Sequence, residues 1–408
     1  MQRVARLTPI QRFLWSSLEV LREHQLSALN RILDAAIISE PYRRLYGSHR
    51  QLQDLEELSE LPVIDRQYLA QFPVDQRLTR QVEDLEREPS TGTTGEVMLS
   101  MRAPEEVVYQ DLLVVRQFIQ QGIPSNARYL DLRFGPDPNQ PLVVEGNVGV
   151  ISAWAPVENQ ADAAQLFKPS VISGPPSTLL EMGEFVGGLE VESVLTYAEV
   201  LTPTDRDQLR RMFAADPFDV YGASETGAIA WECASRSGYH VNADAMIVEV
   251  LNDDLEPVPL GEVGNLVITT LWNPTMPVIR YRIRDVGGLV PQPCPCGITL
   301  PLMGQVEGRD NDCPVTGDGR RVSPNRFILA AVGQYFGDVA RWRVIQRDVD
   351  DFLVEVVWRG RPVSDFRERI TETYSRAMGG PVHVELREVD RLSASPGRKV
   401  RWLESLVE

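Results

Sequence analysis

The sequence predicts an α/β protein whose large N-terminal body holds doubly wound, mostly parallel sheets. From residue 127 onward, short apolar runs alternate with longer stretches of helical spacing, which is the pattern of parallel strands joined by crossover helices. Each run also ends in small or polar residues, and doubly wound sheets bind ligands beyond the carboxyl ends of their strands. The four runs are ARYLDLRF (127–134), PSVISG (169–174), ESVLTYAE (192–199) and FDVYGASE (218–225).

Further elements flank these strands within the body. Residues 21–40 predict an amphipathic helix, because leucine and isoleucine recur at helical spacing from Leu26 to Ile37. A smaller β subdomain is expected over about residues 233–305. Its strands are DAMIVEVLN (244–252), GNLVITTLW (264–272) and MPVIRYRIRDVGGLV (276–290).

The C-terminal part of the chain predicts a small, mobile α+β domain. Strand-like alternation surrounds one amphipathic helical stretch there. The segments are a hairpin of RWRVIQR (341–347) and DFLVEVVW (351–358), a helix over 365–380 and a strand PVHVELREV (381–389). We therefore divide the chain into domains 1–307 and 308–408, with a hinge near 308–312.

The composition is that of a globular protein long enough to bury a sizeable core. The chain has 408 residues, 43% of them apolar and 24% charged, and a net charge of −17. This charge argues against a nucleic acid or an anionic membrane as a partner, since either needs a basic face. No run reaches about 18 apolar residues. The N-terminus does not resemble a signal peptide, and four cysteines are too few for a disulfide scaffold, so we expect a cytoplasmic protein.

One loop is rich in glycine and hydroxyl groups. It comprises Ser90, Thr91, Gly92, Thr93, Thr94 and Gly95. Glycines let a backbone approach a ligand closely, and hydroxyl and free N–H groups can surround phosphate oxygens. Taken alone, such a loop is more often an ordinary turn, and the G-x-x-x-x-G-K pattern of a Walker loop is absent.

Two strand ends carry further candidate ligands. In YGASETG (221–227), Tyr221 is suited to stacking on a planar base and Glu225 to holding a cation such as Mg²⁺. In IRYRIRDVG (279–287), Asp285 is suited to bridging the two hydroxyls of a ribose. Each motif alone is also consistent with an ordinary turn or an exposed acidic strand end.

Together and in this order, these motifs resemble those of the adenylate-forming superfamily of acyl-CoA synthetases, adenylation domains and luciferases. The likeness is greatest to its phenylacetate-CoA ligase branch. STGTTG resembles the SSGTTG phosphate loop of that branch, and YGASETG resembles its YG-x-TE element. PVIRYRIRDVG, CPCGITLPLMGQVEGRDND and SPGRKVRW resemble its PVIRYRTRDL, CPCGRT…GR-x-DD and terminal GGK-[VA]-R segments. The likeness runs from the Pro41–Tyr42 region to Lys399.

The resemblance implies a role for each match. The loop 90–95 would grip the β- and γ-phosphates of ATP, and Tyr221 would lie against the adenine. Glu225 would bind Mg²⁺, Asp285 would hold the ribose, and Arg309 would act near the hinge. The other nucleotide contacts would come from Ala198, Glu199, Gly222, Ala223 and Ser224. From strand-end position, the residues expected to contact the acid are Phe134, Thr196 and Ala223.

Lys399 carries the resemblance into the C-terminal segment. Of the 41 basic residues, only Lys168 and Lys399 are lysines. An ammonium is a compact charge on a flexible stem, whereas a guanidinium is a broad planar fork. The resemblance implies that Lys399 reaches the carboxylate oxygen and the α-phosphate as the adenylate forms, where its charge stabilises the departure of pyrophosphate. The alternative is a solvated surface lysine.

Three of the four cysteines and one of the four histidines form a further candidate site. Cys233, His240, Cys294 and Cys296 are the ligand types of a closed, structural zinc site. Free thiols and a surface histidine are the alternative, because C-x-C is a less usual spacing than C-x-x-C. Cys313 lies in the hinge loop and is not included.

We therefore expect ATP-dependent activation of an aryl or arylacetic acid as an acyl-adenylate, with pyrophosphate release and transfer to a thiol, CoA. Departures from the family pattern at Glu96, at Asn311 and in LSAS (392–395) keep two alternatives open. One is transfer to a carrier protein, an amine or a hydroxyl, and the other is a degenerate nucleotide-binding module without turnover. The expected cofactors are ATP and Mg²⁺, the partners are the acid and CoA or a carrier protein, and a homodimer is left open.

Overall fold

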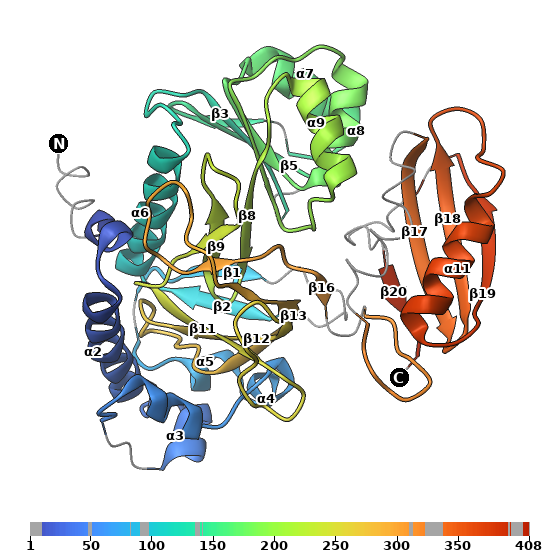
Figure 1. Ribbon diagram of the computed structural model, residues 1–408. Helices are drawn as coiled ribbons and strands as arrows, with labels where there is room; N and C mark the ends of the chain where they lie inside the picture. Colours follow the sequence, from blue (N-terminus) through green and yellow to red (C-terminus); the bar gives the residue numbers. More distant parts are fainter. Residues whose placement is uncertain are drawn as a thin grey trace. The chain divides into compact units, whose positions relative to one another are not determined.

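The computed structural model divides into two compact units (Figure 1). It describes residues 10–47, 51–81, 83–89, 98–134, 139–140, 142–309, 313–322, 338–390, 392 and 403–407. The larger unit comprises Met1–Ile283 and Gly287–Gln305, and the smaller one comprises Arg284–Val286 and Val306–Glu408. The predicted domain boundary at 307/308 and the mobility of the C-terminal domain stay predictions. Of the predicted hinge, residues 310–312 lie outside the described part of the chain.

A ten-stranded sheet is the main element of the larger unit. Its order is β14-β15-β10-β9-β8-β7-β6-β3-β5-β4. Strands β8, β7, β6, β3 and β5 are parallel, which confirms the doubly wound pattern and the four predicted strands, and the remaining pairs are antiparallel. The strands are β3 (Tyr129–Arg133), β4 (Val143–Glu145), β5 (Val148–Ser152), β6 (Val171–Gly174), β7 (Ser193–Tyr197), β8 (Phe218–Ala223), β9 (Gly227–Glu232), β10 (Tyr239–Val241), β14 (Leu289–Val290) and β15 (Leu302–Met303).

Helices cover both faces of the parallel strands, as their nearly continuous apolar sequences require. Successive side chains of a strand point to opposite faces, so Leu130 and Leu132 join one buried cluster while Tyr129 joins another. The first cluster contains residues of α7 (Val157–Phe167), α8 (Pro176–Val186) and α9 (Pro203–Phe213). The second contains Phe118 of α6 (Pro104–Gln120). Figure 1 shows α7, α8 and α9 grouped together and α6 on the other side of the sheet.

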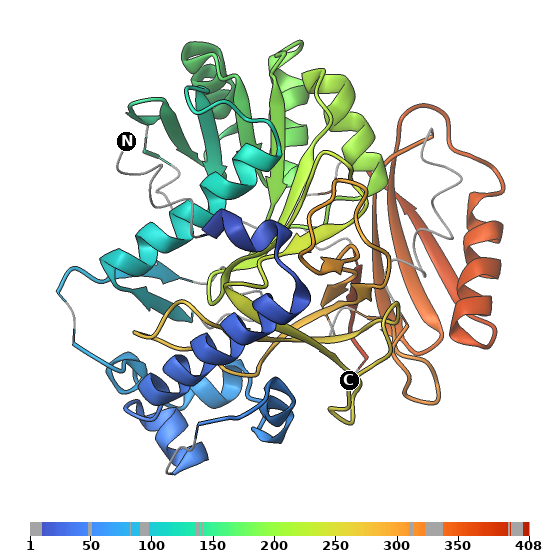
Figure 2. The same cartoon turned by 60° about the vertical axis from the view of Figure 1, so that its left-hand side comes forward.

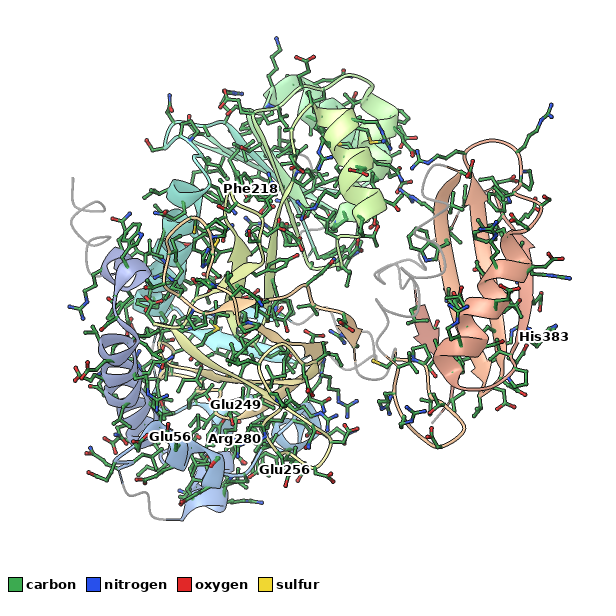
Figure 3. The ribbon with its side chains drawn as sticks, in the orientation of Figure 1. Glu56, Phe218, Glu249, Glu256, Arg280 and His383 are labelled. Carbon is green, nitrogen blue, oxygen red and sulfur yellow. The ribbon has the colours of Figure 1, made fainter. Side chains whose placement is uncertain are left out.

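A separate four-stranded sheet has the order β11-β12-β13-β16. Its strands are β11 (Met246–Leu251), β12 (Gly264–Thr270), β13 (Tyr281–Gly287) and β16 (Gly308–Arg309). The strands predicted over 244–252 and 264–272 are therefore confirmed, whereas the stretch predicted as one strand over 276–290 contains β13 and, in the large sheet, β14. By contrast, β10, β14 and β15 extend the large sheet instead of joining β11 and β12 in one β subdomain. Arg280, just before β13, is bound to Glu249 of β11 by an ion pair of 2.9 Å, and both are labelled in Figure 3.

Helices precede β1 in the larger unit. They are η1 (Arg12–Trp15), α2 (Leu18–Ala36), α3 (Glu40–Tyr46), η2 (Leu55–Glu60), α4 (Arg66–Ala70) and α5 (Val74–Arg77). The helix predicted over 21–40 is confirmed as α2, although it ends at Ala36 and a second helix begins at Glu40 with Pro41 in its first turn. Leu29 and Leu33 of α2 are buried in one cluster with Tyr281. Figure 2 shows α2 and α6 on one side of the larger unit.

The smaller unit is the predicted α+β arrangement. Its four-stranded sheet has the order β19-β18-β17-β20, and one helix packs on it. The elements are β17 (Val339–Asp348), β18 (Asp351–Trp358), α11 (Phe366–Met378), β19 (His383–Glu388) and β20 (Leu403–Ser405). The predicted apolar stripe of the helix is confirmed, because Phe366, Ile370, Tyr374 and Met378 are its buried residues. Nowhere in the described part of the chain is a helix both long and apolar enough to span a bilayer.

Candidate functional site

The predicted nucleotide corner follows the ends of β7 and β8, which pair in parallel. Tyr221 lies in β8 opposite Ala230 of β9. At Gly222, an added Cβ atom would lie 2.6 Å from the carbonyl oxygen of Gly227, so only glycine fits there. The corner therefore depends on a close approach between two backbone segments.

The segment after β7 forms the neighbouring part of the corner. Ala198 has a φ of +69°, a left-handed conformation that is uncommon for a residue with a Cβ atom. The carboxylate of Glu199 accepts a hydrogen bond from the backbone N–H of Ser177, near the start of α8, at 3.1 Å. The chain thus turns sharply at the end of β7, and Glu199 links this turn to the first turn of α8.

Side chains hold the 221–227 corner against the antiparallel strands β1 (Glu86–Pro89) and β2 (Leu99–Arg102). Arg102 donates to the backbone carbonyl of Ser224 at 2.5 Å and forms an ion pair with Glu88. The hydroxyl of Ser224 lies 3.5 Å from the carbonyl oxygen of Pro89. Glu225 is 9% exposed and accepts a hydrogen bond from the hydroxyl of Tyr281 at 3.4 Å.

The predicted phosphate loop, Ser90 to Gly95, lies outside the described residues, and so do Glu96 and Lys399. The strands on either side of it are described. Pro89, the last residue of β1, is paired with Leu99, the first of β2. The chain therefore leaves and re-enters this ribbon at adjacent points, next to Ser224.

Asp285 and Arg309 belong to the smaller unit. They are paired in the register of β13 and β16, and Arg309 Nε lies 3.8 Å from Asp285 Oδ1. Asp285 is the more buried of the two, with 16% of its side chain exposed against 37% for Arg309. The two residues, predicted for different roles, are thus brought together.

The residues predicted to contact the acid occupy different environments. Phe134 follows β3, and its ring centroid lies 5.3 Å from that of Trp154. Ala223 is the last residue of β8. Thr196 is fully buried in β7 and donates its hydroxyl to Asp219 Oδ1 at 2.6 Å. The hydroxyl of Thr196 therefore serves a polar network inside the sheet.

That network was missed by sequence reasoning. Asp219 of β8 accepts hydrogen bonds from Thr196 and from the hydroxyl of Tyr239 (2.8 Å), and its backbone N–H donates to Glu232 (2.8 Å). Arg206 of α9 donates to both carboxylate oxygens of Glu232. Burial raises the pKa of Asp219 to about 7, against the effect of the Thr196 hydrogen bond. An acidic residue inside the apolar run FDV was the signal available in the sequence.

A second buried carboxylate was also missed. Asp131 of β3 accepts hydrogen bonds from Ser173 (2.6 Å) and Tyr197 (2.7 Å), and it is paired with Arg133 at 2.7 Å. These side chains come from β3, β6 and β7, so they link three parallel strands. Burial raises the pKa of Tyr197, and the charge of Asp131 adds to this shift.

The four predicted metal ligands meet in the larger unit. The ligand atoms of Cys233, His240, Cys294 and Cys296 all lie within 4.8 Å of one another. Cys233 Sγ is 3.6 Å from Cys294 Sγ, and Cys296 Sγ is 3.3 Å from His240 Nε2. His240 is fully buried, although the sequence left a surface position open. We call these four residues the Cys₃His cluster.

Comparisons with known proteins give a consistent picture. No protein-family model matches the chain. The phenylacetate-coenzyme A ligase of Thermus thermophilus is 36% identical over 166 residues, which is 38% of this chain and 37% of the relative. Those of Pseudomonas putida and Escherichia coli are each 25% identical, over 73% and 75% of this chain and 72% and 74% of the relatives. The alignment with the Thermus enzyme thus spans little more than a third of its length.

Solved structures show the same fold. A crystal structure of 2-hydroxyisobutyryl-CoA ligase in the postadenylation state has a TM-score of 0.80 at 17% identity and covers 97% of this chain and 91% of that one. An anthranilate-CoA ligase in complex with anthranoyl-AMP has a TM-score of 0.56 at 14% identity and covers 85% and 73%. At these identities the likeness establishes the architecture alone.

Proposed function

Because the chain belongs to the adenylate-forming superfamily, on its phenylacetate-CoA ligase-like branch, we propose that it activates a carboxylic acid with ATP and passes the acyl group to CoA. The observation that carries this proposal is the junction of the 221–227 corner with β1 and β2. Ser224 lies 3.5 Å from Pro89, the residue directly before the predicted phosphate loop, and Glu225 is the next residue in the chain. A phosphate loop and a cation ligand thus come from segments that touch.

The proposed roles divide the nucleotide among these segments. The loop 90–95 binds the β- and γ-phosphates, Tyr221 lies against the adenine, and Asp285 accepts hydrogen bonds from the ribose hydroxyls. Backbone at Ala198, Glu199 and 222–224 completes the nucleotide contacts. Glu225 suits Mg²⁺, because its carboxylate offers the hard oxygen ligands that this ion prefers and is held in place by Tyr281. When bound, Mg²⁺ neutralises phosphate charge.

Lys399 supplies a further positive charge in the proposed mechanism. As the carboxylate oxygen of the acid attacks the α-phosphorus, the bond to the β-phosphate oxygen breaks and pyrophosphate leaves with the electron pair. The ammonium of Lys399 stabilises the negative charge that gathers between acid and α-phosphate. Arg309, near the predicted hinge, takes part in the movement that brings Lys399 in and later removes it. CoA then attacks the acyl carbon and expels AMP.

The acid is proposed to be an aryl or arylacetic acid. Three named relatives are phenylacetate-coenzyme A ligases. Phe134 and Trp154, whose rings lie 5.3 Å apart beyond the end of β3, offer aromatic surface of the kind that packs against an aryl ring. The polar network behind Thr196 gives that part of the sheet a fixed shape.

The Cys₃His cluster is proposed to hold one structural Zn²⁺. Three thiols and one imidazole form a closed tetrahedral set without a vacant position for substrate. The four residues come from the end of β9, from β10 and from the loop before β15, so the ion would join the outer strands of the large sheet. It would take no part in the chemical steps.

A panel of carboxylic acids tests the function. Purified protein, ATP and Mg²⁺ are incubated with each acid, and pyrophosphate release is measured; aryl acids are expected to be the best substrates. Mass spectrometry after addition of CoA is expected to show the acyl-CoA thioester. Pyrophosphate release without a thioester product favours a carrier protein, an amine or a hydroxyl as acceptor. If no acid in a broad panel causes pyrophosphate release, the remaining interpretation is a nucleotide-binding module without turnover.

A further inference from the structure

A cationic side chain with no partner among the described residues is buried near the 221–227 corner. Arg77, the last residue of α5, is 8% exposed. Nε and Nη1 of its guanidinium have no hydrogen-bond partner among the residues that the structure describes. It also forms no ion pair with any carboxylate in those segments. None of the roles proposed above uses this residue.

Such a group needs an explanation. A guanidinium remains charged in proteins, and a buried charge without a counter-ion destabilises the fold. Burial lowers the pKa of Arg77, and only nearby Tyr281 acts against that shift. An apolar side chain of the same length would serve packing better. The arginine is therefore more easily understood as the ligand of an anion that joins the protein later.

The surroundings of Arg77 show where that anion would lie. Arg77 lines a narrow pocket together with Ser100, Arg102, Glu225 and Asn273. The enclosed part of this pocket has room for about one water molecule. One phosphate oxygen would fill the same space. Asn273 Oδ1 also lacks a partner among the described residues, and a water beside the anion can donate to it. The charge of Arg102 is already matched by Glu88, so Arg77 is the cation left to act.

The position of the pocket identifies the part of the substrate that reaches it. Glu225 is the proposed Mg²⁺ ligand, and Ser100 lies in the strand that follows the phosphate loop. Phe134 and Thr196, which are assigned to the acid, do not line the pocket. The pocket therefore belongs to the phosphate end of the site.

We propose that Arg77 binds a terminal phosphate oxygen of the nucleoside triphosphate, and of the pyrophosphate that leaves, in the pocket beside Glu225; this inference rests on the proposed function. The guanidinium of Arg77, which lines the pocket, donates to that oxygen. The charge of the leaving group grows as its bond to the α-phosphorus breaks, so a buried guanidinium stabilises the departing pyrophosphate more than the bound triphosphate. CoA transfer involves no terminal phosphate and does not use Arg77.

The experiment compares Arg77→Met with wild-type protein, using Mg²⁺–pyrophosphate and tripolyphosphate as probes. Methionine removes the charge while filling similar space. Without ligand, the variant is expected to unfold at the same temperature as the wild type or higher, because an unpaired buried charge is gone. Calorimetry is expected to show binding of both anions at least about tenfold weaker, as for loss of a charge-assisted hydrogen-bond pair. Transfer from supplied acyl-adenylate to CoA should be unchanged.

Arg80→Met is the matched control. Arg80 lies three residues further on, has 42% of its side chain exposed and already binds Glu105 and Thr275. The Arg80→Met variant loses one positive charge from the same segment, and it should bind pyrophosphate as tightly as the wild type does. Equal weakening in both variants would show a general charge effect and overturn the proposal.

Two further outcomes decide the remaining cases. Anion binding by Arg77→Met within twofold of the wild type, or equal losses in adenylation and CoA transfer, overturns the assignment. If Arg77→Met does not fold, Arg77→Lys replaces it: the charge stays but the planar guanidinium is lost, and unchanged pyrophosphate affinity then rejects the guanidinium as the phosphate ligand. Failure of the proposed function itself appears separately, as absence of acid-dependent pyrophosphate release in wild-type protein that still binds tripolyphosphate.

Discussion

Asp285 and Arg309 face each other across paired strands, with Arg309 Nε 3.8 Å from Asp285 Oδ1. The sequence assigns Asp285 to the ribose and Arg309 to the hinge, and the pairing places the two roles on adjacent backbone. A carboxylate that already has a cation beside it keeps its orientation. We infer that Arg309 orients Asp285 toward the ribose hydroxyls as well as acting near the hinge.

Replacing Asp285 by asparagine is expected to raise the KM for ATP about tenfold or more, because charge-assisted hydrogen bonds to the ribose are lost. The KM for the acid should change little. Asp253→Asn is the control, since this carboxylate is 76% exposed and 3.8 Å from Arg282. Steady-state kinetics of pyrophosphate release measure both constants. An unchanged KM for ATP in Asp285→Asn would contradict the ribose role.

Replacing Lys399 by alanine is expected to slow adenylation by roughly two to three orders of magnitude, as when one key electrostatic donor is removed. CoA transfer from supplied acyl-adenylate should persist, because that step does not need the ammonium. Lys168→Ala is the matched control, since Lys168 is the only other lysine, directly follows α7 and has no proposed role. Single-turnover measurements of each half-reaction separate the two steps. Full adenylation by the Lys399 variant would remove the lysine from the mechanism.

The fold followed from the sequence where the local pattern was strong. Strands β3, β6, β7 and β8 have nearly continuous apolar runs, and α11 has one uninterrupted stripe. Strand β5 was missed because glycines weaken its strand signal. At Gly149, a Cβ atom would lie 3.2 Å from the ring of Phe167, which is a tight contact. A close approach between chain segments cannot be read from the local pattern, and neither can the membership of β10, β14 and β15 in the large sheet.

The sequence predicted those site residues that stand in a recognisable motif. The motif residues 221–225 and the Cys₃His cluster were named from the sequence, and the structure brings the four metal ligands together. Asp219 and Arg77 were missed for a different reason. Their importance depends on burial and on partners, present or absent, that come from distant parts of the chain, such as Tyr239 for Asp219. Neither residue stands in a motif.

The zinc proposal predicts about one Zn²⁺ per chain in elemental analysis of purified protein, because the cluster has one set of four ligands. Cys294→Ser is expected to lose the metal and to unfold about 5 °C or more below the wild type, since a structural ion contributes to folding. Cys313→Ser is the control, because Cys313 lies outside the cluster. Purified wild-type protein that contains no zinc, or that unfolds at the same temperature after a chelator has removed the zinc, would contradict the structural role of the ion.

The buried carboxylate of Asp219 predicts how stability depends on pH. Its pKa is raised to about 7 in the folded protein by burial, against about 3.9 in an unfolded chain. Between these values the folded state holds a proton that the unfolded state has released, so the free energy of unfolding falls as pH rises from about 4 to 7 and levels off above.

Asp219→Asn is expected to remove most of that fall, because asparagine is neutral at every pH and can still bond to Thr196 and Tyr239. Each pKa unit is worth about 1.4 kcal/mol, so the variant should approach or exceed wild-type stability near pH 8. Denaturant unfolding at pH 5, 6.5 and 8 measures this, with Asp162→Asn, an exposed carboxylate of α7, as control. Parallel pH profiles for Asp219→Asn and the wild type would mean that Asp219 stays ionised in the folded sheet, with Arg206 offsetting its burial through the shared Glu232 network.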